Sequence, residues 1–324
     1  MNNMTKFYMA PMEGVTTYVF RNVFEKHYGG IDKYYTPFVA NSKLKGREKS
    51  EVSRETNTCE NLIPQILANN ENTFLCIAAQ LEDMGYREVN LNVGCPSRTV
   101  TAKGRGAGML DDLFVLEKFM DNIFNKCNVD ISIKTRIGIS SLNEWEDILR
   151  VYKKFPIKEL IIHTRLLDEM YTGNGHIESF KMAKEMLDIP LCYNGEIKDE
   201  DSFNMLKNEC MDVEAVMLGR GLVSDLMLAW KLKNLENKSA KDETAFENTN
   251  IEKVDDKFVK FHNDLLDEYV KVMPGETPVL FKMKELWGFW GKYFCIDSKG
   301  LKEIRKAKRV DQYKNIINEI IVSK

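Results

Sequence analysis

Short apolar runs recur along the first 235 residues at a nearly regular interval. Eight of them are rich in β-branched and aromatic residues, and they begin near Lys6, Lys33, Asn61, Glu88, Asp130, Glu159, Ile189 and Val213. Successive starts are 24 to 30 residues apart, except for 42 between the fourth and the fifth run. The intervening segments carry apolar residues at helical spacing, for example in residues 112–123. Eight strand–helix units of this length predict an α/β fold, a (β/α)8 TIM barrel.

An open, doubly wound sheet is the competing arrangement for alternating strands and helices. It is disfavoured because the first predicted strand-to-helix turn, residues 10–14 (APMEG), lacks the spaced glycines of a dinucleotide-binding loop. The extra residues of the fourth unit follow Cys95. They include the glycine-rich run 103–108, which we expect to form a flexible polar loop.

The pattern changes after Trp230. Residues 236–250 are polar with few apolar positions, which predicts a surface linker. From residue 251, apolar residues return at helical spacing, as at Phe258, Phe261 and Leu265, and strand-like alternation is absent. We therefore predict a barrel over residues 1–235, a linker over 236–250, and a small C-terminal all-helical domain over 251–324.

Composition and charge exclude several classes of protein. With 44% hydrophobic and 29% charged residues, the 324-residue chain is typical of a globular protein, and no apolar run approaches the roughly 20 residues that cross a membrane. The first residues lack the apolar stretch of a signal peptide, so we expect a cytoplasmic protein that does not bind membranes. Seven scattered cysteines without a Cys-x-x-Cys pair indicate neither disulfides nor a zinc site. A net charge of −3 gives no overall attraction to nucleic acid, which would need a local basic patch.

The fourth run ends in a cysteine held in a turn. Residues 90–97 read NLNVGCPS, so Gly94 and Pro96 stop the strand on either side of the Cys95 thiol. Free cysteines are often buried structural residues. The place at a strand end, before a glycine-rich loop, favours a functional thiol instead, because barrel enzymes carry their reacting groups there.

The carboxyl ends of the predicted strands carry further polar residues that could form one site. They are Glu13, Gln65, Asn92, Lys134, Arg136, His163, Arg165, Asn194, Glu196 and Arg220. Gly195 and Gly219 follow the seventh and eighth strands, where barrels commonly bind phosphate. Taken singly, Lys134 or His163 could be only structural. A strand lysine, a phosphate site and a thiol together indicate a flavin mononucleotide (FMN) barrel in which Cys95, protonated at rest, gives a proton.

Other mechanisms lack their signatures in this chain. The sequence has no Gly-x-Ser-x-Gly elbow, no Walker loop and no His-Glu-x-x-His pair, and only four histidines. We therefore expect no metal ion.

An ordered set of short motifs spans nearly the whole predicted barrel. They are residues 10–16 (APMEGVT), Gln65, 90–97 (NLNVGCPS), 134–138 (KTRIG), 163–165 (HTR), 194–197 (NGEI) and 219–221 (GRG). In this set the chain resembles the bacterial tRNA-dihydrouridine synthases. The resemblance implies an FMN-binding barrel with a helical tRNA-binding domain. It also implies an activity, the reduction of the C5–C6 bond of particular uridines in tRNA with electrons from NADPH or NADH.

The resemblance assigns roles to individual positions. It implies that Cys95 protonates C5 after flavin N5 delivers hydride to C6, and that Asn92 holds the uracil ring. The positions that resemble flavin-binding residues are Pro11, Met12, Glu13, Gln65, Lys134, His163, Asn194, Gly195, Glu196, Gly219 and Arg220. Arg136 and Arg165, at neighbouring strand ends, are further candidates for substrate binding.

A local basic patch is present near the C-terminus. Between Val279 and Val310, nine lysines and arginines stand against three acidic residues, interleaved with six aromatic residues. Such a pattern is often a solvated face over an apolar one, but with a tRNA substrate it is a candidate RNA-binding surface. The candidates are Lys282, Lys284, Lys292, Arg305, Lys306, Lys308 and Arg309.

Two other functions stay open at this point. Another flavin barrel, such as a dihydroorotate dehydrogenase or an old-yellow-enzyme-like reductase, would share the phosphate site but act on a small molecule. The basic helical tail argues against it. A tRNA-binding protein without catalysis is disfavoured by the intact set of Cys95, Lys134 and His163.

Overall fold

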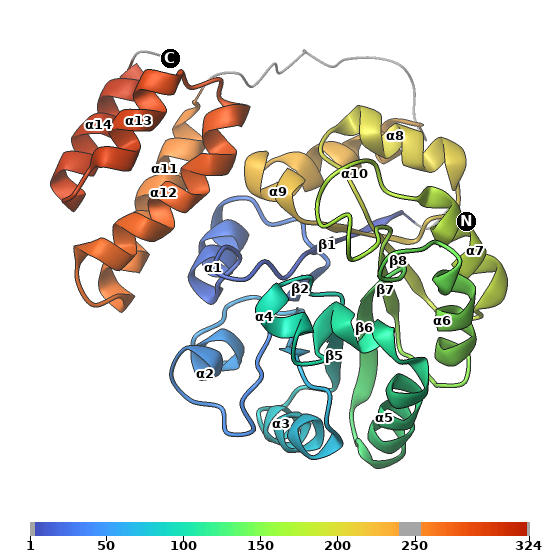
Figure 1. Ribbon diagram of the computed structural model, residues 1–324. Coiled ribbons are helices and arrows are strands. Elements are labelled where there is room, and N and C mark those ends of the chain that lie inside the picture. The colour runs from blue at the N-terminus through green and yellow to red at the C-terminus, as the bar shows by residue number, and fades with distance from the viewer. Residues whose placement is uncertain (1–3, 240–253, 323–324) are drawn as a thin grey trace.

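A parallel sheet closed into a barrel forms the centre of the fold (Figure 1). The structure, a computed structural model, describes residues 4–239 and 254–322. Within these residues, nine short strands pair in the order β3-β2-β1-β9-β8-β7-β6-β5-β4. Their bounds are β1 (Lys6–Met9), β2 (Lys33–Tyr35), β3 (Leu62–Ile63), β4 (Gln65–Ile66), β5 (Glu88–Val93), β6 (Asp130–Arg136), β7 (Leu160–His163), β8 (Leu191–Asn194) and β9 (Ala215–Leu218). Every predicted run begins within two residues of a strand, so the strand positions are confirmed.

Pro64 divides the third predicted run into the two shortest strands. β3 pairs with β2 on one side, and β4 pairs with β5 on the other. Proline has no N–H to donate, so the ladder is interrupted there. Its carbonyl still accepts a hydrogen bond from the Asn90 N–H at 2.8 Å. β3 and β4 together occupy one strand position of the barrel. The nine strands therefore form the predicted eight-stranded barrel and not an open doubly wound sheet.

Helices between the strands cover the outside of the barrel (Figure 1). They are α1 (Tyr18–His27), α2 (Gly46–Val52), α3 (Glu71–Asp83), α5 (Leu113–Lys126), α6 (Glu144–Tyr152), α7 (Ile177–Met186), α8 (Glu200–Glu209), α9 (Arg220–Ser224) and α10 (Leu228–Ser239). Most bury an apolar stripe. In α6 the stripe includes Trp145, Ile148, Leu149 and Tyr152, which are spaced by three and four residues.

The expectation of a flexible loop after Cys95 is wrong. Residues 98–111 contain the short helix α4 (Arg98–Thr101) and the 3-10 helix η1 (Gly106–Asp111). Ala107 is buried, and its N–H donates to the Cys95 carbonyl at 3.1 Å. A side chain at Gly106 would place its Cβ 2.8 Å from the same carbonyl. The glycine is therefore needed for close packing against the cysteine turn and not for mobility.

A partly buried ionic cluster lies at the amino-terminal end of the barrel. Lys33 Nζ lies 2.9 Å from Glu159 Oε2 and 3.4 Å from Glu88 Oε2. The Tyr8 hydroxyl donates to Glu159 Oε1 at 2.7 Å. The adjoining interior is packed with Tyr8, Ala10, Tyr35, Ile161, Cys192, Ala215 and Met217. Room for a ligand is thus left at the carboxyl ends of the strands.

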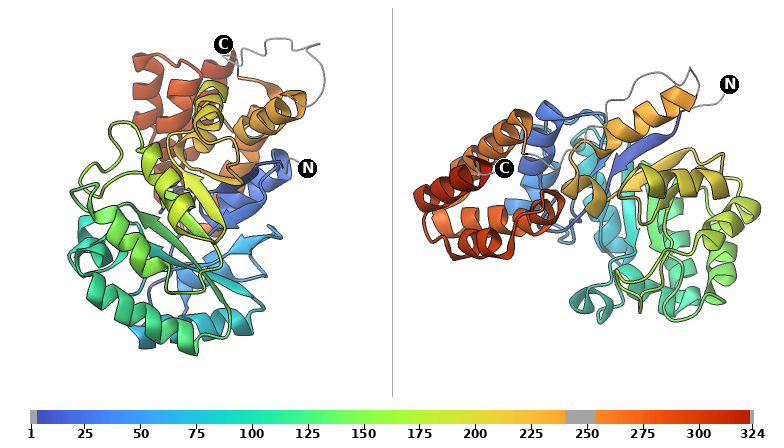
Figure 2. Two further views of the ribbon diagram at one scale, coloured as in Figure 1. Left: turned by 90° about the vertical axis from the view of Figure 1, so that its right-hand side faces the viewer. Right: turned by 90° about the horizontal axis from the view of Figure 1, so that it is seen from above.

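Four helices after the barrel pack beside it, and we call them the helical unit (Figure 2). They are α11 (Asp256–Val272), α12 (Glu276–Tyr293), α13 (Ser298–Lys306) and α14 (Val310–Val322). The predicted helical C-terminal region is thereby confirmed. α11 lies along α1, where the Phe261 ring meets those of Phe20 and Tyr28 edge-on at 5.9 and 5.4 Å. α10 runs four residues into the predicted linker, and the rest of that linker, 240–250, lies outside the described residues.

Aromatic residues form the core of the helical unit. Trp287, Trp290 and Phe294 are at most 4% exposed and surround Phe258. The Trp287 Nε1–H is satisfied inside the core by the Tyr313 hydroxyl at 2.7 Å. The mixture of basic and aromatic positions is therefore mainly a basic surface over an apolar core, because burying the rings removes far more apolar area from water than burying the lysines would.

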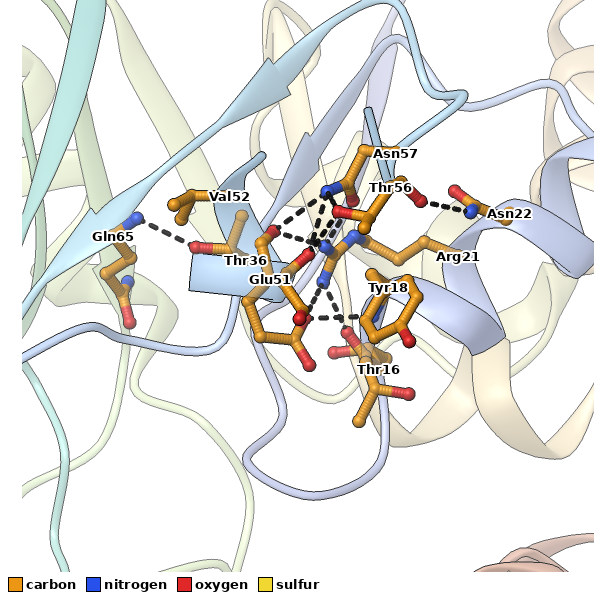
Figure 3. Close-up of polar contacts among 12 residues, drawn as sticks. Thr16, Tyr18, Arg21, Asn22, Thr36, Glu51, Val52, Thr56, Asn57 and Gln65 are labelled. Carbon is orange, nitrogen blue, oxygen red and sulfur yellow. Dashed lines mark hydrogen bonds and ion pairs between the residues drawn. The ribbon is translucent and has the colours of Figure 1, made fainter. Parts of the chain in front are cut away.

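A buried ion pair supports the loop between β1 and α1 (Figure 3). Arg21 Nη1 of α1 lies 3.0 Å from Glu51 Oε2 of α2, and both side chains are at most 4% exposed. The Arg21 guanidinium also donates to the Thr16 carbonyl at 2.8 Å and to Asn57 Oδ1 at 2.7 Å, while Glu51 accepts from the Tyr18 N–H at 2.8 Å. Buried charges are tolerated when they are paired and hydrogen-bonded in this way. α1, α2 and the loop after β1 are therefore held together.

The described residues contain neither a membrane-spanning helix nor a metal-binding cluster. Among the helices in residues 4–239 and 254–322, none combines the length and the hydropathy needed to cross a membrane. Over these ranges, no group of three His, Cys, Asp or Glu side chains could hold a metal ion.

Candidate active site

A cavity of about 510 Å³ lies at the carboxyl ends of the strands. Every barrel residue that the sequence predicts for the site lines it. These residues are Pro11, Met12, Glu13, Gln65, Asn92, Cys95, Lys134, Arg136, His163, Arg165, Asn194, Gly195, Glu196, Gly219 and Arg220. The barrel topology brings them together because parallel strands end on the same face.

Asn92 shapes the turn that carries Cys95. Its Oδ1 accepts from the backbone N–H groups of Gly94 at 3.0 Å and Cys95 at 2.9 Å. Its Nδ2 donates to Gln65 Oε1 at 2.7 Å, and Gln65 Nε2 donates to Asn90 Oδ1 at 2.8 Å. The structure thus gives Asn92 and Gln65 a positioning role. Their predicted contacts with uracil and flavin stay predictions.

The half-buried Cys95 thiol is protonated near neutral pH. Burial raises its pKa above the ordinary value, and this outweighs a backbone hydrogen bond from Ser97 and the charge of Lys134, which lower it. A nucleophilic or metal-binding cysteine would need the thiolate. A protonated thiol on the wall of a cavity is suited to give a proton.

Lys134 brings a buried ammonium to the cavity. Burial, with Arg136 nearby, lowers its pKa from 10.5 to about 8. Within the described residues, no carboxylate or carbonyl oxygen accepts a hydrogen bond from its Nζ. An unpaired buried cation is unfavourable for folding, so its presence points to a ligand that supplies an electron-rich atom or a negative charge.

Lys134→Met should stabilise the ligand-free protein by on the order of 2 kcal/mol at pH 7, because it removes that buried charge. The pKa of Lys134 is about 8 in the folded protein and 10.5 ordinarily. Between these pH values the unfolded wild type binds more protons, so its stability rises with pH and the advantage of the variant shrinks. Urea unfolding of both proteins from pH 7 to 10 measures the difference. A variant less stable than the wild type at pH 7 would mean that Lys134 is paired.

Three arginines and Glu196 line the cavity beside Lys134. Arg165 Nη2 lies 2.5 Å from Glu196 Oε2, and Arg220 Nη2 lies 2.8 Å from both Glu196 oxygens. Arg136 is buried and donates to three backbone carbonyls at 2.7 to 3.1 Å. Four cations against two carboxylates, Glu196 and Glu13, favour an anionic ligand such as a phosphate. The donors of Arg136 and Arg165 largely hold the protein's own backbone and Glu196, so their contact with substrate stays a prediction.

His163 is neutral, and its tautomer follows from one contact. Its Nε2 lies 3.2 Å from Arg165 Nη1, and since a guanidinium only donates, Nε2 accepts and Nδ1 carries the proton. Burial and the neighbouring cations, Lys134 first among them, hold the pKa of His163 well below its ordinary value. The imidazole therefore offers a hydrogen-bond donor without adding charge.

Tyr171 lines the cavity but is absent from the predicted set. Its ring centroid lies 6.2 Å from that of His163, and 5.5 and 5.2 Å from the guanidinium carbons of Arg136 and Arg220. Tyr171 lies in the loop between β7 and α7. An aromatic residue soon after a strand end was the sequence signal that could have identified it as a site residue. Other lining residues that were not predicted include Pro37, Phe38 and Met170.

Two glycines after β9 serve different purposes. A Cβ at Gly221 would overlap the Ile197 carbonyl, so packing requires glycine there. At Gly219 the nearest atoms to an added Cβ are Ala10 Cβ at 3.6 Å and Met12 Sδ at 3.9 Å. Its missing side chain leaves space beside two cavity-lining residues, where a ligand can approach the backbone.

The predicted basic residues of the helical unit fall into two kinds. Lys282 Nζ donates to the Gly14 carbonyl at 2.6 Å, and Lys284 Nζ donates to the Ala307 carbonyl. The exposed members are Lys292, Arg305, Lys306, Lys308 and Arg309. Two further exposed lysines of α13 were not predicted, Lys299 and Lys302. Since Lys282 and Lys284 are engaged within the protein, α13 is the better candidate for an RNA contact.

The sequence profile of one known family matches most of the chain. Its description is Dihydrouridine synthase (Dus), and it matches residues 8–276, from β1 to the start of α12. This chain belongs to the tRNA-dihydrouridine synthase family. The resemblance seen in the sequence is thereby confirmed.

Curated tRNA-dihydrouridine synthases match over most of their length. The chain is 27% identical over 315 residues to Probable tRNA-dihydrouridine synthase 2 of Bacillus subtilis (strain 168), covering 92% of this chain and 91% of that protein. It is 28% identical over 274 residues to Probable tRNA-dihydrouridine synthase of Staphylococcus aureus (strain N315), covering 82% and 78%. The similarity to the first protein therefore extends into the helical unit.

Solved structures share the barrel with this tRNA-dihydrouridine synthase family member at low identity. Histamine dehydrogenase from Rhizobium sp. 4-9 superposes with a TM-score of 0.53 at 10% identity, covering 72% of this chain and 46% of that chain. A 2-naphthoyl-CoA reductase complex gives 0.51 at 9% identity, covering 71% and 50%. These similarities support the TIM-barrel fold and nothing finer.

Proposed function

We propose that this protein reduces specific uridines in tRNA to 5,6-dihydrouridine, with FMN as its bound cofactor and NADPH or NADH as electron source. One observation carries the proposal. In a chain of this family, a protonated Cys95 thiol, an unpaired Lys134 ammonium and three arginines meet in one cavity. A tRNA substrate also assigns the activity to the cytoplasm.

The residues around the cavity fit FMN. Lys134 has no partner of its own and would hold the electron-rich flavin ring. Gly219 and Arg220, with the loop after β8, would hold the phosphate, since the backbone there is open and the charge is positive. Residues proposed for the remaining contacts are Pro11, Met12, Glu13, Gln65, His163, Asn194, Gly195 and Glu196. Bound there, FMN would supply a hydride to uracil C6, and the nicotinamide would restore its electrons.

Cys95 would give its proton to uracil C5, so that the two carbons gain one hydride and one proton. The raised pKa of Cys95 keeps the thiol protonated before the reaction. Lys134 and Arg136 act in the opposite direction on that pKa, so their charges would stabilise the thiolate that is left. Solvent then returns the proton.

The helical unit would provide a second contact with the RNA. A uridine in folded tRNA must leave its base stack to enter a cavity. The protein therefore needs a second contact elsewhere on the tRNA. Exposed lysines and arginines on α13 are suited to phosphates. We therefore assign the chemistry to a barrel over residues 1–235 and RNA binding to residues 251–324.

The full chain and an unmodified tRNA transcript test this function. We expect the purified protein to be yellow, or to become so with FMN, and to form dihydrouridine under anaerobic conditions with NADPH or NADH. Mass spectrometry of the digested tRNA detects the added hydrogens and locates the modified position. A protein that binds no flavin, or that binds it and leaves every uridine unchanged, would overturn the proposal.

Replacing Lys302 and Arg305 by methionine should weaken tRNA binding most strongly at low salt. Each lost phosphate contact lowers the slope of log affinity against log salt by about 0.7 to 0.9. Lys118 and Lys153 are exposed on the barrel, and their double replacement is the control with the same charge change. Filter binding over a salt series compares the two. If the Lys302/Arg305 variant and the control variant bound tRNA equally well at every salt concentration, α13 would not be part of the RNA-binding surface.

A further inference from the structure

Helix α12 of the helical unit contacts two loops of the cavity wall at once. In its first half, Lys282 Nζ donates to the Gly14 carbonyl at 2.6 Å. About two turns later, the Trp290 Nε1–H donates to the Val223 carbonyl at 2.9 Å. Both acceptors are backbone atoms of the barrel. α12 thus holds the barrel's main chain and not only its surface side chains.

The first of these bonds fixes the loop between β1 and α1. Gly14 has a φ of +77°, and the loop is closed by the Val15 N–H to the Met12 carbonyl at 3.0 Å and by the Met12 N–H to Thr16 Oγ1 at 2.8 Å. A Cβ at Gly14 would lie 3.1 Å from Lys282 Nζ, so the ammonium lies directly against the backbone. Residues just before Gly14 in this loop line the cavity. Lys282 therefore bonds to the loop that carries them.

The second bond holds the short helix α9, which follows β9. Val223 lies in α9, and Gly219, Arg220 and Gly221 at the start of that helix line the cavity. Trp290 and Val223 are at most 1% exposed. A carbonyl buried at this depth loses free energy when its donor is removed, because water cannot replace the bond.

The two loops are neighbours in the barrel. β1 pairs with β9, and the Ala10 N–H donates to the Leu218 carbonyl at 2.9 Å, at the point where both strands end. Figure 1 shows the helical unit on the side of the barrel that carries α1 and α9. One wall of the cavity is thus formed by two adjacent loops, and α12 holds both from outside.

We propose that α12 positions the flavin-binding wall of the cavity, with Lys282 and Trp290 as positioning residues. This rests on the proposed function, which makes FMN the ligand of that wall. A helical unit that only bound RNA could be loosened without effect on the cofactor. Here the contacts of the helical unit contribute to cofactor affinity. Lys282, which the sequence predicts as a tRNA contact, instead bonds to the barrel.

Lys282→Met should weaken FMN binding by roughly five- to twenty-fold with no RNA present, because it removes a charged donor from the Gly14 carbonyl. Titration of the apoprotein with FMN, followed by flavin fluorescence, measures the dissociation constant. Lys282→Arg keeps a cationic donor and should restore most of the affinity. Trp290→Phe keeps a ring but removes the N–H, and should weaken binding in the same direction.

Lys284→Met is the matched control. This lysine lies two residues further along α12, but its ammonium donates to Ala307 at the end of α13, inside the helical unit. Its replacement should loosen that end and leave FMN affinity within about two-fold, as for sites that share no partner. Thermal unfolding of each variant, followed by circular dichroism, verifies that the proteins compared are folded.

The possible outcomes separate this proposal from the proposed function. Weaker FMN binding in Lys282→Met, with recovery in Lys282→Arg and no change in Lys284→Met, supports the role of α12. Equal affinity in the wild type, Lys282→Met and Trp290→Phe overturns it and leaves the proposed function intact. If Trp290→Phe does not fold, the Lys282 pair decides alone, since that side chain is partly exposed. A wild type that binds no FMN removes both proposals.

Discussion

Replacing Cys95 by alanine is expected to lower dihydrouridine formation by roughly 10²- to 10⁴-fold, the range typical for loss of a general acid. The thiol that is proposed to protonate uracil C5 would then be missing from the cavity wall. FMN and tRNA affinity should change little, because Asn92 holds the turn through backbone N–H groups and not through the thiol. Single-turnover assays with the flavin reduced beforehand isolate this step.

The pH dependence of the same step gives a second measurement of Cys95. An acid must be protonated to act, so the wild-type rate should hold at neutral pH and fall as the pH rises through the pKa of the thiol. Burial raises that pKa, so the fall should begin above the ordinary range for cysteine. Cys95→Ser should resemble the alanine variant, because a hydroxyl is a far weaker acid.

Cys76 provides the control for the thiol. It is exposed on α3 and bonds to the Ser42 carbonyl, outside the cavity. Cys76→Ala should keep the wild-type rate and pH profile. If Cys95→Ala also kept them, the proton would have to come from another group, and the assignment of Cys95 would fail.

Glu51→Gln should lower the free energy of unfolding by about 3–5 kcal/mol, the usual loss when one partner of a buried ion pair is removed. Arg21 would stay buried without a counter-charge, and its Nε already has no acceptor within the described residues. The glutamine retains the shape of the side chain, so the change tests charge and not volume. Urea unfolding at pH 7 measures it.

An exposed ion pair of similar geometry is the control for Glu51. Glu146 and Arg150 are 2.6 Å apart on α6, with both side chains more than half exposed. Glu146→Gln should cost less than about 1 kcal/mol, because water solvates the partner that is left. Similar losses for the two variants would show that burial adds nothing to the Arg21–Glu51 pair.

The strand positions and the barrel residues of the cavity were predictable for one reason. Parallel strands buried on both faces are short apolar runs, and the residue that follows each run must lie at the same end of the barrel. Lys134 and His163 could thus be placed together although 29 positions separate them in the sequence. Neither position required knowledge of packing.

Partners across the fold were not predictable in this way. Periodicity indicates whether a side chain faces inward, but not which atom it meets. Lys282 was read as a surface cation, yet it donates to Gly14, 268 positions earlier in the chain. In the same way, Gly106 looked like part of a mobile loop, whereas a side chain there would overlap the Cys95 carbonyl. Both interpretations needed a contact that only tertiary packing supplies.

The filled floor of the barrel has a kinetic consequence. In the described part of the chain, Lys33, Glu159 and the packed side chains around Tyr8 close the amino-terminal end, so the cavity has no second entrance there. In the proposed reaction, nicotinamide and uridine would therefore both enter at the carboxyl ends of the strands. The two reactants would then share a single route to the site.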